Sequence, residues 1–106
     1  MLLLMGSNTT EAHPIIGNRI KKAAKGGLKI IVIDPRKIDM VKSAHKHLQI
    51  NVGTDIALIN AMIRIIIKEK LYDQGFIGRH TEDFDVLLSK VERYTPEYSA
   101  EITGLA

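Results

Sequence analysis

The stretch from Leu28 to Arg36, Leu-Lys-Ile-Ile-Val-Ile-Asp-Pro-Arg, constrains the fold more than any other part of the chain. Its apolar residues are mostly β-branched and run without interruption from Ile30 to Ile33, which is typical of a strand buried on both faces in a parallel sheet. The strand has to end at Pro35, because proline has no N–H to donate to a strand ladder. Asp34 therefore lies at the carboxyl end of a buried strand, where open α/β sheets bind their ligands.

Two side chains at this strand end suit a nucleotide. The carboxylate of Asp34 is an acceptor for two ribose hydroxyls, and the guanidinium of Arg36 offers a planar fork to a phosphate or a carboxylate. The simpler alternative is that Asp34 caps a turn and that Arg36 is a solvated surface side chain. Both interpretations of this stretch stay open at this point.

A strand, a helix and a second strand are predicted over residues 2–33. The apolar run from Leu2 to Met5 predicts the first strand, and Gly6-Ser7-Asn8 follows at its carboxyl end. Residues 9–13 are predicted as a polar loop, and Pro14 opens a helix that Gly26-Gly27 ends. The two strands are expected to be parallel. The fingerprint Gly-x-Gly-x-x-Gly is absent after Gly6, which argues against the usual kind of NAD site.

The second half of the chain is predicted to be mainly helical. A short helix or turn over residues 37–44 leads to a third strand within residues 45–52. Thr54 or Asp55 then caps a helix over about residues 56–71, which is apolar on nearly every side and should be buried on several of them. Further helices are predicted over residues 76–79, over residues 82–93 with Thr81 as the cap, and from Pro96 onward with Thr95 as the cap.

These elements predict an α/β protein, a Rossmann-like three-layer domain with a short parallel sheet of about three strands and flanking helices. With 106 residues, the chain is long enough for one domain at most. We expect residues 1–106 to form a single, partial cofactor-binding domain whose C-terminal portion, about residues 72–106, is helical.

Composition excludes several classes of site. The chain has no cysteine, which rules out disulfides, thiolate zinc sites and iron–sulfur ligation within these residues. The net charge of +3 is spread along the chain and aromatic residues make up only 5%, so no nucleic-acid partner is expected. No apolar run is long enough to span a bilayer, and a cytoplasmic location is expected. The four histidines and the carboxylates suggest neither a metal site nor an acid–base pair, so the chain by itself offers binding and no catalysis.

Three loops follow the three predicted strands, and all carry polar groups. In a parallel sheet they would lie along one edge. Gly6-Ser7-Asn8 could present backbone N–H groups to a pyrophosphate, Asp34 could hold a ribose, and Asp55 could accept from the N1–H and amino groups of a guanine. Turn chemistry and helix capping also explain Gly6, Asn8 and Asp55 one at a time, and that alternative stays open.

The ordered set of motifs resembles the molybdopterin oxidoreductases, and most of all the catalytic α subunits of formate dehydrogenases. The motifs are Gly6-Ser7-Asn8 with His13-Pro14, then Ile33-Asp34-Pro35-Arg36, then the run from Gly53-Thr54-Asp55 to Met62. The pairs Phe76-Ile77 and Ile102-Thr103, with Tyr94-Thr95-Pro96-Glu97 between them, continue the resemblance over essentially the whole chain.

The resemblance implies a bis(molybdopterin guanine dinucleotide) cofactor that carries molybdenum or tungsten. Its first cofactor loop matches Gly6, Ser7, Asn8, Glu11 and Ala12, its second matches Asp34, Pro35 and Arg36, and its third matches Gly53 and Asp55.

The resemblance also implies what this chain does not contain. The cysteines for an iron–sulfur cluster, the metal-ligating cysteine or selenocysteine and a catalytic arginine belong to other parts of the subunit. We therefore expect one piece of a larger formate-oxidising subunit, whose partners are the rest of that subunit and an electron-transfer subunit.

Two alternative functions stay open. The chain could belong to another member of the family, of the nitrate reductase or formylmethanofuran dehydrogenase type. It could also be a stand-alone nucleotide-binding module without redox activity. In isolation the chain is expected to self-associate, because its apolar helix and strand edges would stay uncovered.

Overall fold

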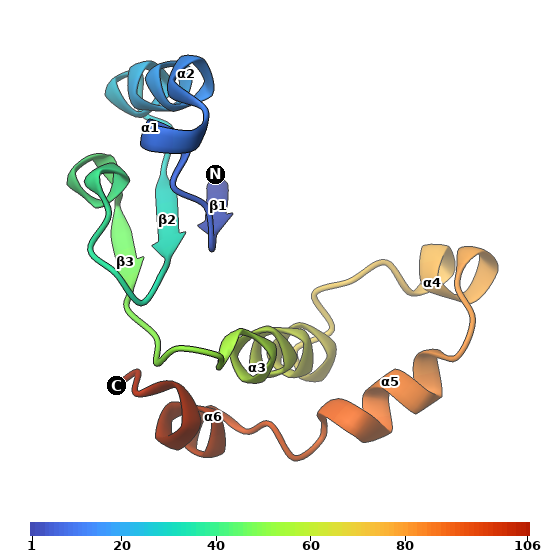
Figure 1. The fold of residues 1–106 in the computed structure, drawn as a ribbon. Coiled ribbons are helices and arrows are strands. Elements are labelled where there is room, and N and C mark those ends of the chain that lie inside the picture. Colours follow the sequence, from blue (N-terminus) through green and yellow to red (C-terminus); the bar gives the residue numbers. More distant parts are fainter. The chain divides into compact units, whose positions relative to one another are not determined.

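The computed structural model describes residues 1–106, which form two compact units, Met1–Ile50 and Asn51–Ala106. The first unit contains a parallel sheet, and the second consists of four helices (Figure 1). The predicted α/β fold, with three parallel strands, flanking helices and a helical C-terminal part, is confirmed. No helix has both the length and the apolar character that crossing a membrane requires.

The sheet consists of β1 (Leu2–Met5), β2 (Ile30–Ile33) and β3 (Lys46–Leu48), which lie side by side in that order. Both pairs are parallel. The carboxyl ends of β1 and β2 lie together, since Met5 is paired with Ile33. Leu48 is paired with Ile33 on the other side, so all three strands end at one edge of the sheet.

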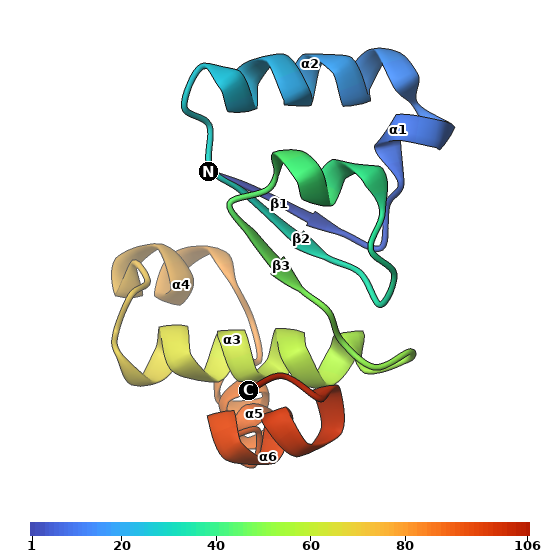
Figure 2. The same ribbon diagram turned by 90° about the vertical axis from the view of Figure 1, so that its left-hand side faces the viewer.

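One face of the sheet carries the core of the first unit. Ile30 and Val32 in β2 are fully buried, and Met40 of the 3₁₀ helix η1 (Asp39–Ser43) packs with them. Ile20 and Ala24 of α2 (Pro14–Lys25) pack against the same cluster, and α2 runs along this face of the sheet (Figure 2). The face is apolar because alternate residues of a strand point to the same side.

The prediction of a polar loop over residues 9–13 is wrong for most of its length, because Thr9–Ala12 forms the short helix α1. Asn8, a residue type that often caps helices, occupies the N-cap position, but its side chain makes no capping bond. The backbone of α1 lies directly against Gly17 of α2: a Cβ at Gly17 would come within 3.0 Å of the carbonyl oxygen of Thr9. This close approach is a tertiary contact that local sequence patterns do not reveal.

An ion-pair cluster ties η1 to α2. Nζ of Lys21 lies 2.6 Å from Oδ2 of Asp39, and Nζ of Lys42 lies 2.9 Å from Oδ1 of the same carboxylate. Hydrogen bonds from the two ammonium groups lower the pKa of Asp39 from 3.8 to about 2. Because both ammonium groups favour the ionised carboxylate, the cluster favours the folded state only while Asp39 is charged.

We expect this cluster to make the stability of the protein depend on acid pH. The pKa of Asp39 is lower in the folded state, so the stabilisation is fully present above about pH 4 and is lost as the pH falls through about 2. Urea unfolding of the wild type and of Asp39→Asn, measured between these limits, should show a steeper loss of stability for the wild type. Parallel curves for the two proteins would contradict this assignment.

In the second unit, α3 (Asp55–Lys68) packs against α5 (Phe84–Val91) and α6 (Pro96–Thr103), and α4 (Gln74–His80) follows α3 in the chain. Three residues of α3 are buried, Ala57, Leu58 and Ala61. The remaining apolar positions of α3 include several exposed isoleucines, among them Ile56, Ile59, Ile65 and Ile66. The expected burial of this helix on several sides is therefore only partly met within the chain.

The helices of the second unit test the capping residues that were predicted from the sequence. Thr95 caps α6 as predicted, since its side chain accepts a hydrogen bond from the backbone N–H of Tyr98. The prediction for Thr81 is wrong, because its hydroxyl donates to the carbonyl of Ile77 and ends α4 instead. Asp83, with a left-handed backbone at φ +56°, precedes α5. A threonine fits both ends of a helix, so its presence alone does not fix which one it serves.

Candidate functional site

Asp34 lies one residue beyond β2, and its side chain is buried although it is a carboxylate. The residue is 3% exposed. Its Oδ1 accepts a hydrogen bond of 2.8 Å from the backbone N–H of Arg36 and lies 3.5 Å from Nε of the same residue. Both contacts engage the same oxygen, which leaves Oδ2 for an external donor. A buried carboxylate with a free oxygen is a strong acceptor for hydroxyl or amino groups of a ligand.

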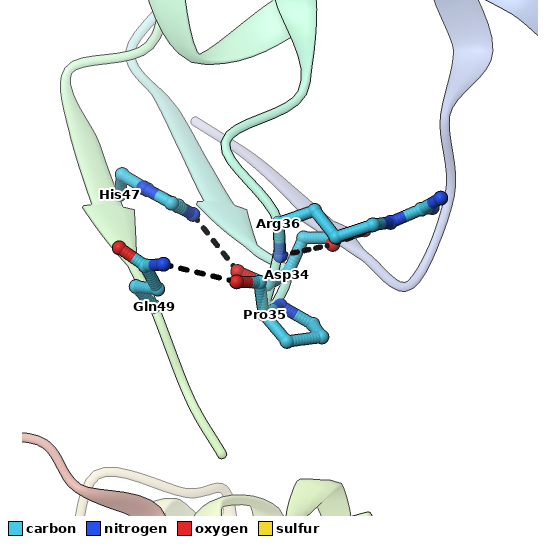
Figure 3. Close-up of polar contacts among 5 residues, drawn as sticks. All are labelled: Asp34, Pro35, Arg36, His47 and Gln49. Carbon is cyan, nitrogen blue, oxygen red and sulfur yellow. Dashed lines mark hydrogen bonds and ion pairs between the residues drawn. The ribbon is translucent and has the colours of Figure 1, made fainter. Parts of the chain in front are cut away.

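Arg36 points away from the strand and into solvent. Its side chain is 73% exposed, so the contact with Asp34 leaves most of the guanidinium free for an anion. Figure 3 shows the side chain of Arg36 extending to the side opposite β3. The alternative interpretation from the sequence, a turn that Asp34 closes, is also present in the structure, because the bond to Arg36 N–H forms such a turn. The turn and a ligand site are thus compatible.

Two side chains, one in β3 and one directly after it, hold the backbone of this turn from the other side. Nε2 of His47 lies 2.9 Å from the carbonyl oxygen of Asp34, and Nε2 of Gln49 donates to the carbonyl oxygen of Pro35 over 3.0 Å. Both side chains reach toward the turn from the same direction (Figure 3). Sequence analysis missed these two residues. The available signal was their spacing of two, which places both on one face of the strand predicted within residues 45–52.

The loop after β1 lies beside this turn. The backbone N–H of Gly6 donates to the carbonyl of Ile33 over 3.0 Å, which joins the two strand ends. Gly6 has φ +58°, a conformation that glycine adopts without strain, and no atom lies within 4 Å of the position of a Cβ. The backbone N–H groups of Ser7 and Asn8 donate to no acceptor in the chain. The loop therefore presents free donors next to the carboxylate of Asp34.

The end of this loop and the start of α1 contain buried polar atoms without partners. Oδ1 of Asn8 and the hydroxyl oxygens of Thr9 and Thr10 are buried and make no hydrogen bond within the chain. Buried polar atoms in folded proteins are nearly always paired with protein, water or ligand. Three such atoms in consecutive residues therefore fit a segment that contacts water or a ligand from outside the chain.

Two of the predicted residues lie further along α1. Glu11 and Ala12 are exposed, and the backbone N–H groups of both donate to the carbonyl of Asn8. The carboxylate of Glu11 has no hydrogen bond or ion pair within the chain. Their predicted role in binding is therefore neither supported nor opposed by a contact of their side chains.

The third predicted loop belongs to the second unit and is held there by the end of α6. The backbone N–H of Asn51 donates to the carbonyl of Thr103, and its side chain donates to the carbonyl of Ile102. Thr54 occupies the predicted N-cap position of α3, but its hydroxyl donates to the carbonyl of Asn51 over 2.7 Å and makes no capping bond to the helix. Gly104 is required at the contact, because it has φ +75° and a Cβ there would meet the Asn51 side chain at 3.0 Å.

This anchoring leaves the start of α3 open. Gly53 has φ +79° with no atom near a Cβ position, and the N–H groups of Gly53 and Asp55 donate to no acceptor in the chain. Asp55 is the first residue of α3, where the positive end of the helix favours a carboxylate. The structure thus brings the first and second predicted loops together at the edge of the sheet, whereas the third is a separately built loop of the second unit.

The chain brings no three histidine, aspartate or glutamate side chains together in a way that would hold an ion.

Comparison with known proteins agrees with these motifs. The sequence model of the family described as Molybdopterin oxidoreductase matches residues 1–104. The chain is 51% identical over 104 residues to the F420-dependent formate dehydrogenase subunit alpha of Methanocaldococcus jannaschii, a match that covers 98% of this chain and 16% of that protein. It is 42% identical over 106 residues to formate dehydrogenase H of Escherichia coli, over 100% of this chain and 15% of that protein.

A solved structure shares the fold. The acetylene hydratase from Pelobacter acetylenicus matches with a TM-score of 0.87 and 38% sequence identity, over 97% of this chain and 14% of that chain. The chain thus spans only about one sixth of the length of the relatives that it matches.

Proposed function

The chain belongs to the molybdopterin oxidoreductase family, and we propose that it forms the part of a formate dehydrogenase α subunit that binds the guanine dinucleotide end of the cofactor. The observation that carries this proposal is the buried carboxylate of Asp34 beside the Gly6 loop. One oxygen of Asp34 is free, and the neighbouring N–H groups of Ser7 and Asn8 have no acceptor.

The residues of the first unit fit a nucleotide in chemical terms. Hydroxyl groups of a ribose need acceptors, and Asp34 supplies one that is buried and ionisable. Phosphate oxygens need donors, and the N–H groups of the Gly6 loop with the exposed guanidinium of Arg36 supply them. The unpartnered Oδ1 of Asn8 would accept from a further donor of the same ligand.

In the second unit, we assign Gly53 and Asp55 to the guanine base. The carboxylate of Asp55 would accept from the N1–H and the amino group, two donors that adenine does not present in this arrangement. Gly53 leaves the backbone open for close approach of a ring. Glu11, Ala12 and Pro35 are included in the proposed site because the family resemblance matches them to the first and second cofactor loops, and Glu11 and Ala12 lie in α1 directly after Asn8.

The remaining parts of the proposal concern the complete subunit. We infer a bis(molybdopterin guanine dinucleotide) with molybdenum or tungsten, an iron–sulfur cluster outside this chain, and an electron-transfer subunit as a partner. When bound, the metal would supply the redox chemistry for oxidation of formate to carbon dioxide. The names of the two formate dehydrogenase relatives support formate as the substrate. A single partial domain and a cytoplasmic location stay predictions.

A chimeric subunit tests the proposal. In it, the 104 matched residues of the Methanocaldococcus jannaschii relative are replaced by this chain. Acid hydrolysis of the purified subunit should release GMP in the same amount per polypeptide as the parent subunit, because the guanine dinucleotide site would be complete. The measurement is GMP by chromatography, with AMP measured alongside. A folded chimera that releases no GMP, or releases AMP instead, would contradict the proposed function.

A further inference from the structure

The turn that carries Asp34 lies where the ladder between β2 and β3 ends. The last ladder bond runs from the N–H of Asp34 to the carbonyl of Leu48, over 3.3 Å. Beyond it, β3 provides no further backbone donor for the carbonyls of Asp34 and Pro35. Instead, the side chains of His47 and Gln49 make these contacts, over 2.9 and 3.0 Å. Two consecutive carbonyls are thus held by the side chains of His47 in β3 and of Gln49, the residue directly after β3 (Figure 3).

We propose that His47 and Gln49 are positioning residues, which fix the Asp34–Pro35 backbone so that the Asp34 carboxylate is presented to the ligand of this edge. The inference rests on the proposed function for the identity of that ligand, but the positioning itself does not depend on it.

The geometry explains how a backbone contact orients a side chain. The ring of Pro35 already limits its own φ and removes its N–H, so the remaining freedom of the turn lies in the peptide planes on either side. Fixing the carbonyl of Asp34 sets one plane and fixing that of Pro35 sets the next. The backbone nitrogen of Arg36 then lies 2.8 Å from Oδ1, and the hydrogen bond between them orients the carboxylate.

The hydrogen bonds of His47 and Gln49 to this turn are not explained by a large contribution to the stability of the fold. Gln49 is exposed, and Pro35 is half-buried, so water can reach the carbonyl of Pro35 and pair with it about as well as an amide does. Replacing water by a side chain at such a place orders the turn more than it stabilises the fold. The ring of His47 has to carry its proton on Nε2, because the carbonyl of Asp34 can only accept.

The test uses the complete 106-residue chain and needs no ligand. Hydrogen exchange of the Arg36 amide, followed by NMR, reports the bond to Oδ1 of Asp34. His47→Leu should speed this exchange about tenfold while the amide of Val32 in β2 stays unchanged, as expected for loss of one neutral hydrogen bond. His47→Gln keeps a donor near the position of Nε2 and should restore the slow exchange. His45→Leu, at an exposed position two residues earlier, is the matched control.

The outcomes distinguish a positioning role of His47 from a contribution to the global stability of the fold. If Arg36 and Val32 speed up together in His47→Leu, the residue acts on global stability and the inference is overturned. It is also overturned if Arg36 does not respond, or if His47→Gln behaves like His47→Leu. Gln49→Met provides the same comparison at the exposed position, in case His47→Leu does not fold.

A second measurement separates this inference from the proposed function. In the chimeric subunit, His47→Leu should lower the released GMP about tenfold, and His47→Gln should retain most of it. If Asp34→Ala lowers GMP and His47→Leu leaves it unchanged, positioning for the cofactor is overturned and the proposed function stands. If neither variant lowers GMP while exchange at Arg36 responds as expected, the proposed function fails and the positioning of Asp34 stands.

Discussion

Asp34→Ala in the chimeric subunit is expected to lower its affinity for the guanine dinucleotide by a factor between about 10 and 150. The factor corresponds to loss of a hydrogen bond to a charged group, which contributes about 1.5–3 kcal/mol. The carboxylate is buried and one of its oxygens has no partner in the chain, so a ligand bond to it would be shielded from water. The measurement is GMP released per polypeptide after the subunit is washed at low cofactor concentration.

Controls for this variant come from the same unit. Asp39→Ala removes a carboxylate that pairs with Lys21 and Lys42, so it changes charge equally without touching the proposed site. We expect it to leave the GMP content unchanged. Asp34→Asn keeps the size of the side chain and should fall between the wild type and Asp34→Ala. GMP contents that do not differ among these variants would remove Asp34 from the proposed site.

The position of Asp34 was predictable from the sequence because three local signals agree. An uninterrupted β-branched run indicates a buried strand, Pro35 ends it, and the topology places the strand's carboxyl end at an edge where ligands bind. Strand β2 and the pairing of β1 with it follow from the same signals. The helix from Pro14 was predictable for an equally local reason, because proline suits the first turn of a helix.

Apart from the cap at Thr81, the parts that sequence reasoning missed depend on contacts that local patterns do not reveal. His47 and Gln49 make no local motif, and their function appears only once β3 lies beside the turn at Asp34. The short helix α1 has no capping side chain and is held against α2 at Gly17. The polar residue Asn51 ties the Gly53 loop to the end of α6, more than fifty residues away in the chain, and no periodicity signals such a bond.

The apolar surface of α3 leads to the last prediction, which concerns the chain by itself. Ile56 is 70% exposed, and Ile59 and Ile66 are each 40% exposed. The latter two are seven residues apart and therefore lie on one side of the helix. Strands β1 and β3 also have one unpaired edge each within the chain. Contiguous apolar surface and open strand edges both favour association with another chain.

We expect the 106-residue chain to self-associate, most simply as a two-fold dimer that buries the isoleucines of α3. Sedimentation velocity over a concentration series should show a rising mass. The double variant Ile59→Lys and Ile66→Lys should weaken association more than tenfold. Complete burial of an isoleucine contributes about 1.5–3 kcal/mol, and the 40% of each side chain that is still exposed would be buried at four positions of the dimer. Ile15→Lys, at an exposed position of α2, is the control. A dimer that survives the double variant would indicate pairing through a sheet edge, whereas a wild-type monomer at every concentration would show that the exposed isoleucines of α3 do not associate with a second copy.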